Sequence, residues 1–389
     1  MKKVRYFIII IIFIVLSIFL LNNIRSSNKE ENIKGNIVIW ANEDTYDYLC
    51  EYSNLFMESY DKTKIEISLI YSSNYKDKIL SSINDNSTPD IIQLSTNESR
   101  RLIKENDLRK YISEEKGIVD NYSSNFSVAR IKEANDKEGL VGVPLTSRPL
   151  ALYLREDMLA QYGYTYEDIN TWDDLKRVGK DILEKTSGEV RILNGVGQDY
   201  EDIISLLVMQ AMEGSNDKGK IEELVKTKLS EISNIMNTKV DGKFLARISS
   251  INSMRELTAL DVPCEWTVNN APAKLNGSNK FYVAEGYNLL VLNESEENSA
   301  LIKRFLEFLA TNTEESIKYV KEGKFFSSYL STYKNKSIEE SIKNFSGKSP
   351  LVVMSNIYEK APEINDYELY LEVKNKILGQ WFKYISIGL

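Results

Sequence analysis

The chain has no histidine and only two cysteines among its 389 residues. Without histidine, Ser-His and Cys-His nucleophile pairs and all zinc sites that use an imidazole ligand are excluded. Cys50 and Cys264 could pair outside the cell, but thiols so far apart in the sequence specify neither a disulfide nor a metal site. The 57 acidic residues could still supply carboxylate pairs, yet without a motif they are typical of solvated helix faces. We therefore expect no cofactor, no bound metal and no enzymatic activity.

The chain also has too few basic residues for a nucleic-acid-binding protein. Its 49 lysines and arginines are outnumbered by acidic residues, and the formal net charge of −8 argues against a concentrated basic face. No internal repeat and no long low-complexity tract is visible. A hydrophobic content of 42% is ordinary for a globular protein. About 350 residues remain after the N-terminal leader, which is enough for two lobes.

The N-terminal leader has the pattern of an export signal. Three basic residues among the first five precede an apolar run from Phe7 to Leu21, and the positive-inside rule then puts the rest of the chain outside the cytoplasm. An A-x-A-like cleavage site is missing, and no cysteine follows the run for lipid attachment. We expect residues 1–27 to be an uncleaved membrane anchor, with a cleaved signal as the alternative, and residues 28–35 to be a tether.

Beyond the tether, short β-branched strands alternate with amphipathic helices. Strands are predicted over 35–40, 64–70 and 89–94, and a helix follows each of the first two. This rhythm predicts a parallel sheet covered by helices. Further strands are expected over 139–144, 150–154, 190–193 and 281–292, helices over 171–184 and 299–311, and a mostly helical C-terminal third.

Five landmarks follow one another in a recognisable order. They are the strand that ends at Trp40, Thr88-Pro89-Asp90-Ile91-Ile92, Gly142-Val143-Pro144, Leu152-Tyr153-Leu154-Arg155-Glu156-Asp157 and Asn170-Thr171-Trp172-Asp173-Asp174-Leu175. Together they resemble the extracellular solute-binding proteins of ABC importers, in the carbohydrate-binding family that includes maltose-binding proteins. The resemblance covers residues 36–184 and 281–331, whereas 190–280 match only loosely.

The resemblance implies an α/β, two-lobed periplasmic-binding-protein-like fold with a hinge between the lobes, preceded here by the N-terminal membrane segment. Family members close on a solute and deliver it to a membrane permease. By resemblance, the N-terminal lobe comprises residues 36–146 plus 281–327, and the C-terminal lobe comprises 147–280 plus 328–389. The implied partners are a mono- or oligosaccharide, ABC permease subunits and, through the leader, the membrane.

Sugar sites combine flat apolar rings with polar groups around the hydroxyls, and 23 Tyr and 4 Trp are available here. Trp40 ends the first strand and is followed by Glu43 and Asp44, and ligands of α/β sheets lie at the carboxyl ends of strands. The alternative for this loop is an ordinary helix N-cap. Arg148 is expected beside the cleft, where the chain crosses between lobes, to bind hydroxyls or an anionic group. Its alternative is a salt bridge on the hinge surface.

Three further candidates come from the resemblance. Asn97 stands where related proteins often carry a carboxylate, so the ligand set is expected to differ from that of a maltose binder. Gln198 and Tyr200 correspond loosely to a binding loop of the second lobe. For the rings in this set, the alternative is packing in the core or at the surface. The ring candidates beyond that loop are Trp266, Tyr287 and Tyr370.

Two other functions stay open at this point. An anchored binding domain could report its ligand to a signalling partner instead of feeding a permease. An anchored glycoside hydrolase would need two carboxylates that flank a cleft, about 5 Å or 6.5–9.5 Å apart, and no motif marks such a pair. The sequence therefore favours a carbohydrate-capturing component of an importer at the extracellular face of the membrane.

Overall fold

The computed structural model describes residues 33–313 and 315–387. The predicted membrane segment and most of the predicted tether lie outside these residues. Among the described helices, none combines the length and the apolar character that crossing a lipid bilayer requires. Cys50 and Cys264 are both partly exposed free thiols.

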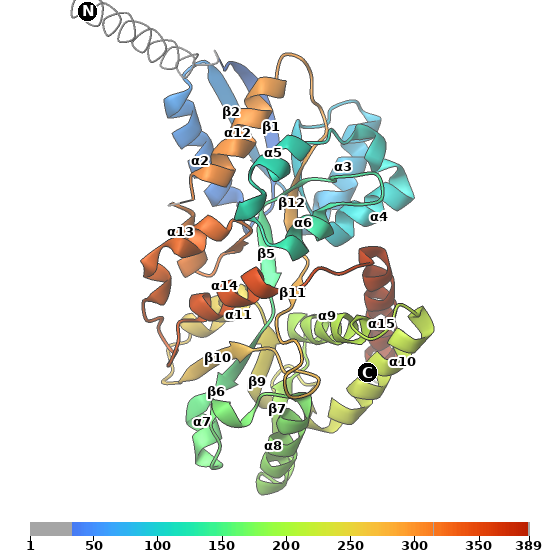
Figure 1. The fold of residues 1–389 in the computed structure, drawn as a ribbon, viewed down its shortest axis with the longest axis vertical. Helices are drawn as coiled ribbons and strands as arrows, with labels where there is room; N and C mark the ends of the chain where they lie inside the picture. The colour runs from blue at the N-terminus through green and yellow to red at the C-terminus, as the bar shows by residue number, and fades with distance from the viewer. Residues whose placement is uncertain (1–32, 314, 388–389) are drawn as a thin grey trace, which may run out of the picture.

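The described chain forms two α/β lobes with a short sheet between them (Figure 1). The first lobe, at the top of the figure, has a five-stranded sheet in the order β2-β1-β3-β12-β4. Its strands are β1 Gly35–Ala41, β2 Thr63–Leu69, β3 Ile91–Ser95, β4 Val143–Pro144 and β12 Tyr287–Val291. Its helices are α2 Tyr46–Ser59, α3 Tyr75–Asn84, α4 Thr96–Asn106, α5 Lys116–Asn121, α6 Val128–Ala134, α12 Ser299–Thr311 and α13 Ser316–Lys321.

This sheet is mixed, so the expectation of a parallel sheet is wrong for one of its strands, β12. β1 runs parallel to β2 and β3, whereas β12 is antiparallel to both β3 and β4. A parallel neighbour needs a long crossover connection, usually a helix. β12 instead arrives directly from the second lobe, with only Glu285 and Gly286 separating it from β11. It therefore enters the sheet in the direction opposite to β3.

The second lobe has its own five-stranded sheet, in the order β10-β6-β9-β7-β8. β6 is antiparallel to β9 and β10, and β7 is parallel to β8 and β9. Its strands are β6 Ala151–Arg155, β7 Val190–Asn194, β8 Met236–Asn237, β9 Lys243–Ser249 and β10 Trp266–Asn270. The helices after β5 and before β11 are α7 Glu156–Gln161, α8 Trp172–Lys185, α9 Gln198–Met212, α10 Lys218–Ile232 and α11 Ile251–Thr258. The C-terminal helices α14 Pro350–Lys360 and α15 Tyr367–Ile387 pack on β10 and on α9 respectively.

A three-stranded sheet, β11-β5-β13, connects the lobes. Its strands are β5 Thr146–Pro149, β11 Val283–Ala284 and β13 Phe326–Ser327. β11 and β13 both pair antiparallel with β5, and β5 and β11 run lengthwise between the two lobes in Figure 1. The lobe boundaries predicted from the sequence fall in or beside these strands and stay a prediction.

Two large apolar clusters stabilise the lobes. One cluster joins Ile39 and Phe305 of the first lobe to Tyr153 of the second sheet and Met354 of α14, all fully buried. The other cluster lies within the second lobe, around Trp172 and its neighbours on α8, α9 and α15. Because the first cluster continues from one sheet to the next, apolar packing that includes α14 stabilises the hinge region.

The start of α8 gives a stability prediction. Thr171 Oγ1 accepts a hydrogen bond from the Asp174 backbone N–H at 3.1 Å, and Asp174 Oδ2 accepts one from the Thr171 N–H at 3.0 Å. This capping box satisfies two amide groups that the helix itself cannot. Thr171→Ala is expected to lower the free energy of urea unfolding by about 1 kcal/mol. Exposed Thr311→Ala is the control, expected within about 0.5 kcal/mol of the parent; equal losses in both would contradict the capping role.

Candidate functional site

A cavity of about 370 Å³ lies between the lobes, on top of the connecting sheet. The first lobe contributes the loop after β1 and the start of α4, and the second contributes the starts of α9 and α11. All three connecting elements, β5, the β11–β12 link and β13, form its base. The carboxyl ends of strands and the helix starts that follow them converge at one edge of each sheet, which is where α/β proteins bind ligands. The volume lies at the lower end of the range of about 300–1,000 Å³ that is usual for ligand pockets.

Five of the residues predicted from the sequence line this cavity. Asp44 lies in the loop after β1, Asn97 in the first turn of α4, and Gln198 at the start of α9. Arg148 lies on β5 and Tyr287 begins β12. The structure therefore brings residues from both lobes and the hinge to one place.

Arg148 is anchored by a carboxylate of the second lobe. Its Nη2 lies 2.6 Å from Oδ1 and 3.0 Å from Oδ2 of Asp202 on α9, and the Asp202 side chain is 1% exposed. Burial opposes the charge on Arg148, but Asp202 and Glu285 outweigh it and hold the pKa of the guanidinium above its ordinary value. Burial raises the pKa of Asp202 to about 6, against the opposing effect of Arg148. The salt bridge considered as the alternative for Arg148 is thus present, and the same side chain lines the cavity.

A second buried ion pair lies beneath the cavity. Lys374 Nζ of α15, 4% exposed, is 3.3 Å from Glu285 Oε1 in the β11–β12 link. The other oxygen of Glu285 accepts the Asn97 backbone N–H at 2.9 Å. Burial alone would raise the pKa of Glu285, but Lys374, the Asn97 N–H and Arg148 together hold it below its ordinary value. This pair joins the connecting strand to the C-terminal helix.

The contacts of α15 with the first lobe continue beside this pair. Asn375 Nδ2 donates to Asn97 Oδ1 at 3.1 Å, and Arg100 Nε of α4 lies 3.4 Å from Glu368. On another side of the cavity, Arg255 Nη1 of α11 lies 3.6 Å from Asp44 Oδ1. Burial raises the pKa of Asp44, and Arg255 opposes that rise. Polar contacts between the lobes therefore flank the cavity.

The other five predicted residues lie outside the cavity lining. Trp40 packs with Ile79 and Ile92 in a core cluster, and the ammonium of Lys78 lies 5.1 Å from its ring centroid. Glu43 is exposed and accepts the Ser72 N–H at 3.2 Å. The rings of the remaining three are buried in the two large apolar clusters: Tyr200, Trp266 and Tyr370.

Several lining residues were not singled out from the sequence. They include Glu98, Glu201, Asn252, Lys324 and Glu285. A sequence signal was available for Glu98 and Glu201. Both stand in the first turns of helices that follow strands of the two sheets, where ligands of α/β proteins bind. The pairing of Glu285 with Lys374 had no local signal, because 89 residues separate the partners.

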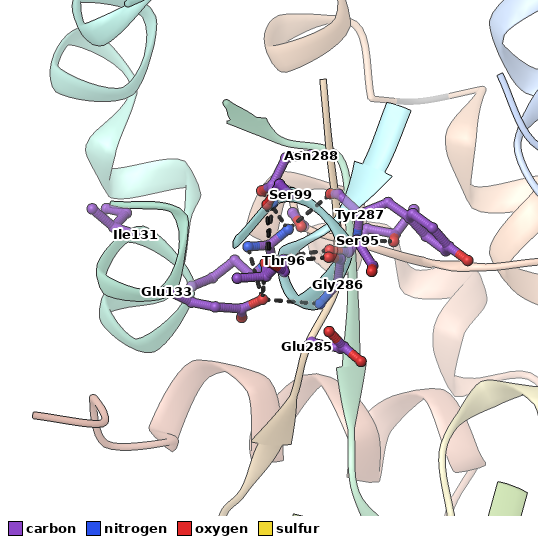
Figure 2. A network of polar contacts seen from close by, with 12 residues as sticks. Ser95, Thr96, Ser99, Ile131, Glu133, Glu285, Gly286, Tyr287 and Asn288 are labelled. Atoms are coloured by element: carbon purple, nitrogen blue, oxygen red, sulfur yellow. Dashed lines mark hydrogen bonds and ion pairs between the residues drawn. The ribbon is translucent and has the colours of Figure 1, made fainter. Parts of the chain in front are cut away.

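A buried polar network holds the connecting strands against the first lobe. Arg130 of α6 is fully buried and donates to the Thr146 carbonyl at 3.0 Å and to the Tyr287 carbonyl at 2.8 Å. Its Nη1 lies 3.3 Å from Glu133 Oε1. Figure 2 shows Glu133 reaching from its helix towards Thr96 and the Gly286 N–H, which donates to it at 3.1 Å.

Gly286 is required at this junction. A Cβ atom there would lie 1.9 Å from the Thr146 carbonyl oxygen, closer than any real contact. Only glycine lets β5 and the β11–β12 link approach each other so closely. The buried Arg130–Glu133 pair therefore holds both β5 and the β11–β12 link through hydrogen bonds beside the cavity.

Two α/β lobes, joined by crossover strands around a polar cavity, are typical of proteins that bind a solute between their lobes. A model of the family described as bacterial extracellular solute-binding protein matches residues 40–237, about half of the chain. The chain belongs to this family, as the order of its sequence landmarks predicted. Among curated protein sequences, none gives a significant match.

Solved structures of sugar-binding proteins have a similar fold. The sugar-binding protein MalE from Xanthomonas citri is 14% identical, with a TM-score of 0.68 over 89% of this chain and 93% of that one. The cyclic alpha-maltosyl-1,6-maltose binding protein from Arthrobacter globiformis is 16% identical, also with a TM-score of 0.68, over 89% and 94%. An ABC substrate-binding protein from Listeria monocytogenes, solved with cycloalternan, is 13% identical with a TM-score of 0.60 over 88% and 94%. At such identities the likeness establishes the two-lobed fold.

Proposed function

We propose that this chain captures a carbohydrate between its lobes and delivers it to the permease of an ABC importer. The observation that carries the proposal is the polar cavity that both lobes, β5, the β11–β12 link and β13 line. A ligand held there contacts both lobes at once, so its binding energy stabilises the closed arrangement over an open one. A permease that recognises the closed form would then receive only loaded protein.

The chemistry of the lining suits a saccharide. The amides of Asn97, Gln198 and Asn252 can both donate to and accept from sugar hydroxyls. Tyr287 is partly exposed at the cavity, and its ring offers a flat apolar face to the C–H groups of a sugar. The proteins named above that bind maltosyl sugars or cycloalternan share this fold, which supports a carbohydrate as the ligand class.

The same proposal includes the place and the mode of action. The family is extracellular, and residues 1–27 are proposed to hold the protein at the outer face of the membrane as an uncleaved anchor. We assign no chemical step to the cavity, so the ligand leaves unchanged. Sensing through a signalling partner remains the competing role for the same binding event.

A ligand screen tests the carbohydrate directly. The full chain, purified in mild detergent, is heated with mono- and oligosaccharides, polyamines or peptides. A ligand at 100 times its dissociation constant is expected to stabilise the folded state by about 2.7 kcal/mol and to raise the melting temperature by several degrees. Gln198→Ala should reduce the shift produced by the sugar, whereas exposed Gln161→Ala on α7 should not. A cooperatively folding protein that responds to none of the sugars would refute the carbohydrate proposal.

A further inference from the structure

Most charges at the cavity are already paired within the protein. Arg148 is bound to Asp202, Glu285 to Lys374, and Asp44 to Arg255. Lys324 also lines the cavity, and its Nζ lies 3.3 Å from Asp47 and 3.4 Å from Glu322. These cations therefore leave little positive charge to offer a ligand.

Two lining carboxylates have no such partner. Within the described part of the chain, neither Glu98 nor Glu201 forms an ion pair. Glu98 uses one oxygen to accept the Ser95 N–H at 3.1 Å in the capping box of α4. Glu201 stands in the first turn of α9, so the two acids reach the cavity from opposite lobes. Helix dipoles favour acids at these positions, but the dipoles do not require both to face one cavity.

The Tyr287 side chain lies within range of the Glu98 charge. Burial raises the pKa of its phenol first, and the charges of Glu98, Asp44 and Glu285 raise it further, against the smaller opposing effect of Arg148. Asp44, Glu285 and Arg148 are each paired within the protein, so the unpaired charge that acts on this phenol is that of Glu98. The cavity thus favours a cation beside the Tyr287 ring.

A hydroxyl of the hinge strand points to a polar ligand as well. Ser147 on β5 is 1% exposed and lines the cavity. Its Oγ has no hydrogen-bond partner among the described residues. A buried hydroxyl without a partner is unfavourable, and a hydrogen bond from a ligand hydroxyl would remove that cost. The unpartnered Ser147 hydroxyl is independent of the two acids, and it favours a hydroxyl on the ligand in addition to the group that the acids bind.

We infer that the ligand is a saccharide that carries a protonated amine, held between Glu98 and Glu201. This inference rests on the proposed carbohydrate-binding function and adds the class of sugar. The amine contacts a carboxylate from each lobe, and its hydroxyls meet the amides and Ser147. Without a cation, closure brings two like charges towards each other, and like charges in a confined site repel. The amine therefore couples ligand recognition to closure.

Matched sugars separate the charge from the sugar skeleton. Calorimetric titration of the full chain in detergent compares glucosamine, glucose and N-acetylglucosamine, and the corresponding β-1,4-linked disaccharides. The amine-bearing member of a set is expected to bind at least about tenfold more tightly than either neutral member, since charge-assisted hydrogen bonds are about twice as strong as neutral ones. Its affinity should also fall as salt is raised.

Charge-removing variants test the two acids. Glu201→Gln and Glu98→Gln keep side-chain size, and glutamine can still complete the α4 capping box. Each is expected to lower the affinity ratio between amine-bearing and neutral sugar by about tenfold. Glu223→Gln, at an exposed position on α10, is the matched control and should leave the ratio unchanged.

The outcomes distinguish this inference from the function on which it rests. Equal affinity for amine-bearing and neutral sugars would overturn the amine but leave carbohydrate capture intact. Tight binding of spermidine with no binding of any sugar would overturn the saccharide, and with it the proposed function. A ratio that survives both variants would refute the placement of the amine between these two acids.

Discussion

Replacement of Arg130 by methionine is expected to lower the free energy of unfolding by about 3–5 kcal/mol, because removal of one partner of a buried ion pair leaves an uncompensated charge. Glu133 is 4% exposed, and Arg130 is the cation beside it. The carbonyls of Thr146 and Tyr287 would each lose a donor as well. Urea unfolding of the full chain, followed by circular dichroism, measures the loss.

Two controls make this result specific. In the double variant Arg130→Met with Glu133→Gln, a neutral side chain replaces the stranded carboxylate, and part of the stability should return. Arg177→Met removes an exposed pair, 3.6 Å from Asp174, and is expected to cost at most about 1 kcal/mol. If Arg130→Met cost no more than Arg177→Met, the buried pair would not be what fixes the connecting strands.

Elements with a strong local pattern were predicted well. The helix expected over 299–311 has the bounds Ser299–Thr311, and the one expected over 171–184 is Trp172–Lys185. The second begins at its capping box, a signal carried by residues three apart. The first strands of the chain are confirmed for the same reason. Their β-branched composition and the helices that follow them can be recognised from neighbouring residues alone.

Strand pairing was less accessible, because it depends on residues far apart in the chain. β12 lies between β3 and β4 in the sheet, although almost 200 residues separate it from β3. The sequence around Tyr287 contains no signal that predicts its pairing with Ser95. β9 was not predicted, because it lies within residues 190–280, where the resemblance to the family is weak. This strand pairs with both β6 and β7 in the second sheet.

The site shows a similar limit. Asp44 follows the end of a strand and was placed by a geometric rule that holds for α/β sheets, whereas Arg148 was placed by the lobe crossing that the family resemblance implies. Large rings were harder to place, because an aromatic side chain serves a core as well as a sugar: Trp266 is 3% exposed and Tyr370 is fully buried. Charge pairs such as Glu285 with Lys374 follow only from the three-dimensional fold.

Replacement of Glu115 by glutamine is expected to stabilise the protein at pH 8 and to change little at pH 5. Glu115 is 4% exposed and its Oε1 has no hydrogen-bond partner among the described residues. Burial, and then the nearby Glu294, raise its pKa from 4.5 to about 7, while Lys303 opposes the rise. Its folded-state pKa lies above the unfolded one, so the contribution of this group is most favourable below pH 4.5 and is lost as the pH rises through about 7.

The stability gained by Glu115→Gln at pH 8 follows from the unfolded and folded pKa values of Glu115, 4.5 and about 7. Each pH unit between them is worth about 1.4 kcal/mol, so the ionised carboxylate costs up to about 3 kcal/mol at pH 8, and the glutamine variant avoids that cost. At pH 5 the native carboxyl is mostly protonated and resembles an amide in charge. Urea unfolding of parent and variant at both pH values gives the difference, and exposed Glu296→Gln is the control, expected within about 0.5 kcal/mol of the parent at each. A gain from Glu115→Gln that is the same at pH 5 and pH 8 would show that this carboxyl does not titrate between them.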